Sequence, residues 1–366
     1  MPITRIAACH VAPVFLSARK TTEKAVKLIH EAAKHKANVI VFPETYIPAF
    51  PIWSSLRPPS ENHDLFQRMV HESIYIDGDE IHAIRAAAKA TKTVVSLGFS
   101  EKSHFSTATL YNSNLMISDN DNVLVHHRKL MPTFFEKLTW SPGDGHGLHV
   151  YQSPYGKIGQ LICGENTNPL ARYALMAQGE QIHISSWPAI WPTHVPAGAT
   201  VGGGGKEIPS GGRMTNYDNL AANHIRAACH CFEAKCFGVV CAGYLDRQAI
   251  ETITAGLMDA GPVIKALEES SQAATFFLDP SGVLFPAFTA SEETGEQQHR
   301  DLLQLEEGIL YADLDLDKCI EGKQYHDVVG GYQRLDVFQL QVNRTRLEPV
   351  VFTETFQSKG TETEDE

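Results

Sequence analysis

The sequence predicts an α/β or α+β protein in which helices cover sheets. Apolar strands alternate with segments of helical spacing along most of the chain, and several strands lead into hairpin turns. The 366 residues, 43% of them hydrophobic, are enough for a large core, in one big domain or in two ordinary ones. No internal repeat is present.

The first half is assigned from apolar spacing and turn residues. Residues 3–11 read as a strand, and 21–35 read as a helix because Ala25, Ile29 and Ala32 fall on one side. Residues 51–73, rich in proline and aromatic residues, read as an irregular excursion with some helix. The remaining expectations are a helix at 80–91 and strands at 38–42, 93–99, 109–117 and 122–127, the last two joined by the turn "SDNDN".

The second half repeats this alternation of strands and helices. Residues 198–212 contain "VGGGGKEIPSGG", which cannot pack as a regular element and is expected to be a mobile loop. The turn "DPSG" joins two short strands, 274–278 and 283–286, as a hairpin. The other expected elements are helices at 169–178 and 217–235 and strands at 157–163, 181–186, 237–242 and 308–314.

Charge and hydropathy exclude several functional classes. The formal net charge is −12 and the positive charges are scattered, so nucleic acid is not an expected partner. No run approaches eighteen apolar residues, and the N-terminus lacks the apolar core of a signal peptide. We therefore expect a soluble cytoplasmic protein without membrane contact. The polar, acidic end of the tail 347–366 is expected to be disordered.

The seven cysteines indicate reduced thiols, because their number is odd and four crowd into the segment 229–241. No paired CxxC or HExxH spacing is present, so no metal site is predicted. Pairs such as His126 with His127, or His224 with His230, read as surface or core histidines. In the helix 217–235, a stripe at helical spacing is expected to face the core: Ala222, Ile225, Cys229, Phe232 and Cys236.

Cys163 stands apart because it ends a buried strand and is followed by Gly164, Glu165 and Asn166. Strand ends are where ligands and catalytic groups gather in α/β proteins. A thiol needs a base or a positive neighbour to become a nucleophile. From its position alone, a packing role and a nucleophilic role are both open.

Two other strand ends favour the nucleophilic role. In the segment "VIVFPETYIP", a buried strand ends at Glu44. In the segment "VHHRKLMPTFFEK", a strand ends at Arg128 and Lys129. Each residue alone would read as a cap, a salt-bridge partner or a solvated edge. Together with Cys163 they supply a base, a cation and a thiol.

These segments carry a resemblance to a known family. "FPETYIP", "HRKLMPTFFEKLTWSPGDG" and "GQLICGENTNPLARYALMAQGEQIHISSWP" resemble, in order and spacing, the three blocks typical of the nitrilase branch of the carbon–nitrogen hydrolases. The later blocks "YDNLAANHIRAACHCFEAKCFGVVCAG", "FLDPSGVLFP" and "GILYADLDLDKC" also fit. The resemblance spans about residues 3–346, which implies one hydrolase domain over 1–346.

The resemblance implies a four-layer α-β-β-α sandwich and a catalytic triad of Glu44, Lys129 and Cys163. Glu136 matches a second glutamate beside the triad. Trp187 in "SSWP" matches a position near the substrate pocket, and Tyr46 in the first block is likewise expected to bind substrate. The resemblance further implies that no cofactor is needed and that the chain forms homo-oligomers, as dimers or spirals.

One position departs from many members of this branch. They carry tryptophan directly after the nucleophile, where this chain has Gly164. The difference removes a large side chain beside the thiol, so we expect Gly164 to influence substrate range. Pocket details are not transferred to the glycine-rich segment 193–215.

The function so implied is hydrolysis of an organic nitrile to the carboxylic acid and ammonia, with some amide as a by-product. In it, Glu44 accepts the thiol proton, Cys163 attacks the nitrile carbon, and Lys129 stabilises the charge that develops. The alternatives are an amidase or carbamoylase, or a hydratase acting on cyanide or nitriles, with the same triad. A binding or scaffold protein that merely keeps the fold is a third reading.

Overall fold

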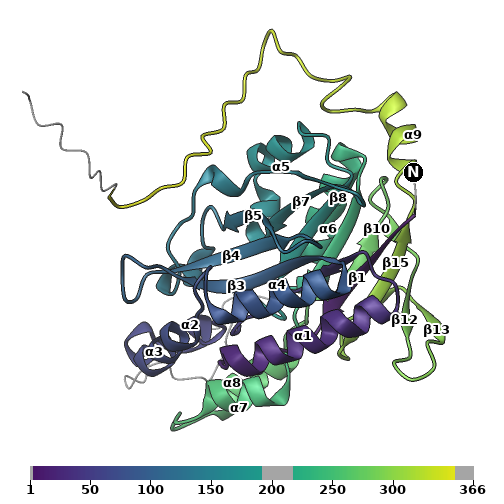
Figure 1. Cartoon of the computed structure of the whole chain (residues 1–366). Coiled ribbons are helices and arrows are strands. Elements are labelled where there is room, and N and C mark those ends of the chain that lie inside the picture. Colours follow the sequence, from purple (N-terminus) through teal and green to yellow (C-terminus); the bar gives the residue numbers. More distant parts are fainter. Residues whose placement is uncertain (1–2, 192–216, 351–366) are drawn as a thin grey trace, which may run out of the picture.

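Two β-sheets packed face to face form the centre of the protein. The structure is a computed structural model that describes residues 3–191 and 217–350 (Figure 1). The eight-stranded sheet has the order β13-β12-β15-β1-β2-β3-β4-β5, with β1 parallel to β2 and β2 parallel to β3. Its strands are β1 (Thr4–His10), β2 (Val39–Val41), β3 (Val94–Lys102), β4 (Leu110–Ile117), β5 (Val123–Arg128), β12 (Ala287–Ala290), β13 (Gln297–Arg300) and β15 (Gly308–Leu314).

The seven-stranded sheet has the order β11-β10-β9-β8-β7-β6, with β14 paired to β10. Strands β7, β8 and β9 run parallel at its centre. Its strands are β6 (Tyr151–Ser153), β7 (Gly156–Ile162), β8 (Ile182–Trp187), β9 (Phe237–Ala242), β10 (Thr275–Leu278), β11 (Leu284–Phe285) and β14 (Leu302–Leu303).

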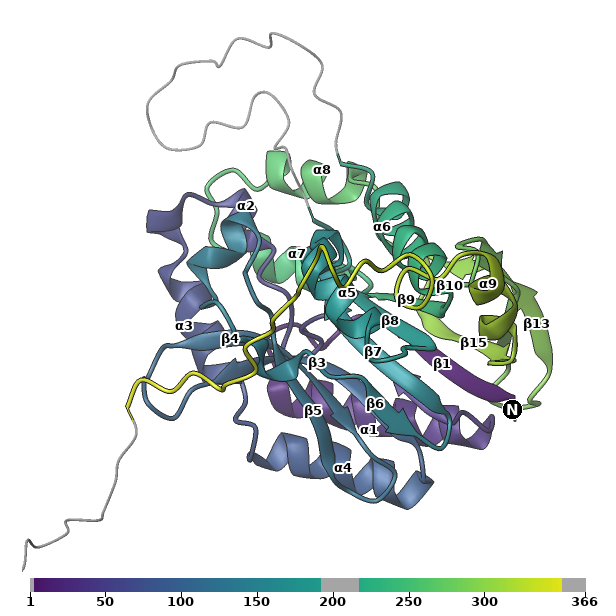
Figure 2. The same ribbon diagram turned by 90° about the horizontal axis from the view of Figure 1, so that it is seen from above.

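Helices cover the outer faces of both sheets. In Figure 2, α1 and α4 lie outside the eight-stranded sheet, and α5 and α6 lie outside the seven-stranded sheet. The α-helices are α1 (Ala18–Lys34), α2 (Trp53–Leu56), α3 (His63–Glu72), α4 (Asp79–Thr91), α5 (Pro169–Met176), α6 (Asn219–Ala234), α7 (Arg247–Thr254), α8 (Gly261–Glu269) and α9 (Lys318–Tyr325). The 3₁₀ segments are η1 (Pro59–Glu61), η2 (Phe134–Leu138), η3 (Gly145–Gly147) and η4 (Cys163–Thr167).

The alternation of side chains along β1 shows how the layers form. Ala7 and Cys9 pack into the core shared with α1 and α4, whereas Ile6 and Ala8 pack into the core between the two sheets. Successive side chains of a strand point to opposite faces, so one buried strand serves two cores. The predicted α-β-β-α sandwich is confirmed.

Most predicted elements are present with shifted ends. The helix expected at 21–35 begins at Ala18, and the hairpin expected around "DPSG" is formed by β10 and β11. The sequence did not predict α7, α8 or α9, nor the short strands β6, β12, β13 and β14. The proposed loop 198–212 and the acidic end of the tail lie outside the described residues.

The core stripe predicted for the helix that became α6 is wrong for Ile225, Cys229 and Phe232, whereas Cys236 is buried just beyond the end of the helix. Ile225 is 69% exposed and Phe232 is 46% exposed, and Cys229 is also at the surface. The buried face of α6 instead comprises Asn219, Asn223, Ala227, His230, Cys231 and Ala234. Polar members of this face are buried because they find partners, as His230 does with Glu180 at 2.7 Å. A pattern based on hydropathy alone therefore selects the wrong side.

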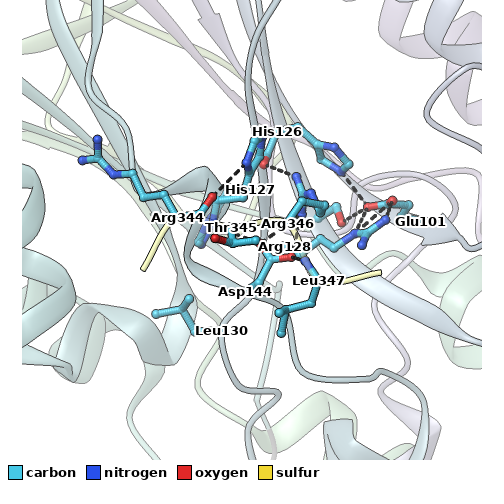
Figure 3. A network of polar contacts seen from close by, with 12 residues as sticks. Glu101, His126, His127, Arg128, Leu130, Asp144, Arg344, Thr345, Arg346 and Leu347 are labelled. Carbon is cyan, nitrogen blue, oxygen red and sulfur yellow. Dashed lines mark hydrogen bonds and ion pairs between the residues drawn. The ribbon is translucent and has the colours of Figure 1, made fainter. Parts of the chain in front are cut away.

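The chain beyond α9 crosses back over the molecule and is anchored beside β5. Figure 3 shows Arg346 reaching Asp144 and the backbone carbonyl of His126, and the backbone N–H of Leu347 donating to Asp144 at 3.0 Å. The packed segment thus extends to at least Leu347.

On its other side, β5 is tied to β3 by a buried carboxylate. Glu101 accepts hydrogen bonds from Arg128 at 2.5 Å and from His126 at 2.7 Å (Figure 3). Burial opposes the charge of Glu101, but these two partners outweigh burial and lower its pKa to about 2. The strand that leads into Lys129 is therefore fixed from two directions.

All seven cysteines are free thiols, as expected. Cys231, Cys236 and Cys241 are buried among apolar residues of the second sheet and α6, which is the packing role predicted for them. Within the two described ranges, no helix is both long enough and apolar enough to cross a membrane.

Candidate active site

Glu44 lies just beyond the end of β2 and is buried. Its Oε1 accepts hydrogen bonds from Lys129 Nζ at 2.8 Å and from Asn112 Nδ2 at 2.7 Å. Its Oε2 is buried without a hydrogen-bond partner among the described residues. The carboxylate is thus held by one oxygen, and the other is available to accept a proton.

Lys129 directly follows β5, and its ammonium group is completely buried between two carboxylates. The second carboxylate is Glu136 of η2, whose Oε2 lies 2.7 Å from Nζ. Glu136 is oriented in turn by the backbone N–H of Thr133 at 3.0 Å and by Trp191 Nε1 at 3.3 Å. A buried charge needs such pairing to remain ionised.

Cys163 directly follows β7 and faces this charged group. Its Sγ and carboxylate oxygens of Glu44 and Glu136 all lie within 4.8 Å of one another. The four residues come from three strand ends and η2, so the structure brings together Glu44, Lys129, Glu136 and Cys163. The ammonium of Lys129 provides a positive charge between the two carboxylates.

Burial and charge set the proton affinities in this group. Burial, together with Glu136 and against Lys129, raises the pKa of Glu44 to about 7. Burial and then Glu44 raise the pKa of the Cys163 thiol well above its usual value, although Lys129 acts in the other direction. For Lys129, burial opposes the charge, but Cys163, Glu136 and Glu44 outweigh it and raise its pKa. The resting site therefore holds a protonated thiol beside a carboxylate that can exchange a proton near neutral pH.

The backbone at Cys163 adopts a left-handed conformation with φ of +49°. Such a conformation is unfavourable for a residue with a side chain and persists only where neighbouring groups enforce it. Glu165 Oε2 accepts from the backbone N–H of Ile162 at 2.8 Å, and Asn166 Nδ2 donates to the carbonyl oxygen of Cys163 at 2.9 Å. These two side chains bracket Cys163 and fix the turn.

Glu165 also joins the thiol segment to the lysine segment. Its Oε1 accepts from the backbone N–H of Leu130 at 2.6 Å, and His127 donates to Oε2 at 2.8 Å. Since Leu130 follows Lys129, one carboxylate sets the relative placement of Lys129 and Cys163. The sequence does not predict this role or that of Asn112; their only sequence signal is position, within "CGEN" for Glu165 and on an adjacent strand for Asn112.

The residues predicted to bind substrate lie in different surroundings. Trp187 ends β8 and packs in the same core as Ile162 and Cys163. Tyr46 is buried against Phe42 and lines an apolar pocket shared with Glu44, and Cys163 is not among the residues that line that pocket.

Gly164 lies directly against Thr133. A Cβ atom built at Gly164 would lie 2.7 Å from Thr133 Oγ1, closer than real Cβ contacts allow. In this chain the hydroxyl of Thr133 therefore occupies the space that a side chain at position 164 would need.

With this geometry established, comparisons with known proteins identify the family. The family model described as carbon–nitrogen hydrolase matches residues 5–324. A nitrilase of Penicillium rubens is 31% identical over 96% of this chain and 96% of its own length. An arylacetonitrilase of Hypocrea virens is 31% identical over 95% of this chain and 94% of its own length.

Solved structures agree on the fold. A Saccharomyces cerevisiae member of branch 10 of the nitrilase superfamily superposes with a TM-score of 0.62 at 16% identity, covering 91% of this chain and 97% of its own. The chain belongs to the carbon–nitrogen hydrolase family. Within that family it is a member of the nitrilase branch.

The contact between Gly164 and Thr133 generates a prediction. Gly164→Ala should lower the free energy of unfolding by about 1–3 kcal/mol, because Cβ must displace the hydroxyl of Thr133. Thr133→Ala removes that hydroxyl, so the double variant should lose less stability than the sum of the two single variants. Urea unfolding of all four proteins measures this coupling.

Thr133→Ser is the matched control because it keeps the hydroxyl and loses only a methyl group. Combined with Gly164→Ala, it should not relieve the crowding. If the stability losses of Gly164→Ala and Thr133→Ala simply add in the double variant, the proposed clash at position 164 does not exist.

Proposed function

We propose that the protein hydrolyses an organic nitrile to the carboxylic acid and ammonia, with Cys163 as the nucleophile. The observation that supports it is the convergence of the Cys163 thiol, the free oxygen of Glu44 and the ammonium of Lys129 in one buried group. Full-length relatives named nitrilase and arylacetonitrilase supply the choice of a nitrile over another carbon–nitrogen bond.

In the first step, Glu44 takes the thiol proton as sulfur bonds to the nitrile carbon, and the nitrile nitrogen receives that proton. The product is a thioimidate, R–C(=NH)–S–Cys163. Lys129 stabilises the negative charge that builds on nitrogen before it is protonated. One preorganised donor of this kind is worth roughly 3–4 kcal/mol of transition-state stabilisation.

The following steps use two water molecules. Glu44 activates the first water, which adds to the thioimidate carbon to give a tetrahedral adduct bearing OH and NH₂. Loss of ammonia leaves a thioester, and the second water releases the acid and restores the thiol. If the tetrahedral adduct expels the thiol instead of ammonia, the product is the amide, so we expect a minor amide by-product.

The triad assignment predicts large losses on substitution. Cys163→Ala, Glu44→Gln and Lys129→Met should each lower nitrile turnover at least about a thousandfold, because each removes the nucleophile, the base or the stabilising charge. A panel of aromatic, arylaliphatic and aliphatic nitriles and cyanide, scored for acid, amide and ammonia, measures turnover.

Cys229→Ala is the control, since this thiol is exposed on α6 and should be dispensable. The matching amides are assayed in parallel. Turnover of amides without turnover of any nitrile would replace this proposal by an amidase, and normal turnover in all three triad variants would refute the triad.

The raised pKa of Glu44 predicts a pH dependence. The base must be ionised to accept the thiol proton, so kcat/KM for an uncharged nitrile should fall as pH drops below about 7. The fall should approach tenfold per pH unit. Circular dichroism over the same range checks that the fold persists, and a flat profile between about pH 5 and 8 would contradict this role of Glu44.

We also propose that the chain forms a homo-oligomer. Apolar side chains on the outer helices α5 and α6 are solvent-exposed in the single chain, namely Leu170, Ile225 and Phe232. Light scattering coupled to gel filtration should give a mass of at least two chains. Ile225→Glu with Phe232→Glu should reduce that mass, and a wild-type monomer at micromolar concentration would overturn the proposal.

A further inference from the structure

A buried polar chain lies behind the nucleophile and takes no part in the mechanism above. His183 Nε2 lies 2.8 Å from Asn166 Oδ1, and His183 Nδ1 lies 2.8 Å from Glu180 Oε1. His230 Nε2 lies 2.7 Å from the other oxygen of Glu180, and the two imidazole rings stack at 3.6 Å. Each of these four side chains is at most 1% exposed.

The surrounding backbone leaves room for this chain. Glu180 lies just before β8, His183 lies in β8 and His230 lies in α6. Three segments of the chain therefore contribute side chains to the cluster. A Cβ atom at Gly159 in β7 would lie 1.9 Å from Glu180 Oε1, so only glycine at this position admits the carboxylate. The cluster is therefore a built feature of the sheet and α6.

The direction of each hydrogen bond follows from the partners. The amide nitrogen of Asn166 faces the backbone carbonyls of Cys163 and Leu161, so its oxygen must accept, and His183 Nε2 must donate to it. Glu180 is an acceptor because its two histidine partners outweigh burial and lower its pKa to about 2. His183 Nδ1 therefore donates as well.

Both ring nitrogens of His183 are thus hydrogen-bonded, Nδ1 to Glu180 and Nε2 to Asn166. His230 donates once to Glu180, and its Nδ1 has no hydrogen-bond partner among the described residues. Burial, and after it the electrostatic effect of the adjacent His183 ring, lower the pKa of His230 to about 4, so His230 is neutral. The 2.8 Å bond from His183 Nε2 to Asn166 Oδ1 is therefore supported from behind by the bond of Nδ1 to Glu180.

We propose that His183, held by Glu180 and His230, is a positioning residue for the nucleophile. It fixes the amide of Asn166, which holds the carbonyl of Cys163 and with it the left-handed turn that presents the thiol. His183 acts only through Asn166. The part of this inference that concerns turnover rests on the proposed function, whereas thiol reactivity does not.

Two substitutions of nearly equal size separate positioning from general packing. Glutamine can place an amide near the position of Nε2 and keep a donor to Asn166, whereas asparagine reaches only the position of Nδ1. His183→Asn should lower alkylation of Cys163 by iodoacetamide about tenfold and lower kcat similarly, with KM changed less than about threefold. His183→Gln should stay within about threefold of the wild type in all three quantities.

Peptide mass spectrometry measures Cys163 alkylation, with glutathione added to each reaction as the reference thiol. The control variant is His10→Asn, since His10 is another buried histidine and bonds Thr275 Oγ1 and the carbonyls of Ala242 and Gln304. It should lower the melting temperature without changing the ratio of Cys163 to glutathione labelling. If the wild type hydrolyses no nitrile, the proposed function is wrong, but the labelling ratio of Cys163 still tests the positioning role of His183.

Equal labelling of Cys163 in His183→Asn and His183→Gln would overturn the proposal. If His183→Asn does not fold, Glu180→Gln replaces it and should lower Cys163 labelling measurably; unchanged labelling would again overturn the proposal. The donor atoms of Glu180, His183 and His230 lie within 4.8 Å of one another. One equivalent of zinc in the wild type, absent from His183→Gln, would therefore overturn it in favour of a metal site.

Discussion

The burial of one ammonium group is the constraint on which the site depends. Lys129 is inaccessible to solvent, and its charge persists only because Glu44 and Glu136 lie at 2.8 and 2.7 Å. One cation cannot fully neutralise two buried anions, so the group keeps a net negative charge. Burial and this excess charge together raise the pKa of Glu44 to about 7. The same ion pairs that keep Lys129 charged therefore leave the carboxylate of Glu44 able to take up a proton near neutral pH.

Because the charges come from distant parts of the chain, the two-sheet architecture has to place them to within hydrogen-bond distance. Glu44 and Lys129 follow strands of the eight-stranded sheet, whereas Cys163 follows a strand of the seven-stranded sheet. Glu165 crosses between the sheets by binding the backbone on both sides of this division. The apolar core between the sheets sets their approach, and this carboxylate sets the finer register of thiol and ammonium.

The sequence predicts the strands well because their apolar runs are long and their ends are marked by polar residues. It identifies Glu44, Lys129 and Cys163 as strand-end groups, but not the partners that hold them, since pairings such as Asn112 with Glu44 join residues far apart in sequence. The stripe predicted for α6 fails for a related reason. His230 is buried because it forms a hydrogen bond with Glu180, which lies 50 residues earlier in the sequence. A local hydropathy pattern contains no information about that partner. Short elements such as α9 are missed because eight residues carry too little periodicity.

The protonation states of the resting site affect the rate of the proposed attack. The thiol is neutral because burial penalises a thiolate, and the negative charge resides on Glu44. When the proton moves to Glu44 as sulfur attacks, that charge passes to sulfur and then to the substrate nitrogen, and the total charge of the buried group stays constant. Lys129 lies beside Glu44, where the charge begins. Little reorganisation is therefore needed when the substrate nitrogen also lies within reach of Lys129. Any loosening of the turn at Cys163 would lengthen that transfer, which is why the buried chain behind Asn166 bears on reactivity as well as on stability.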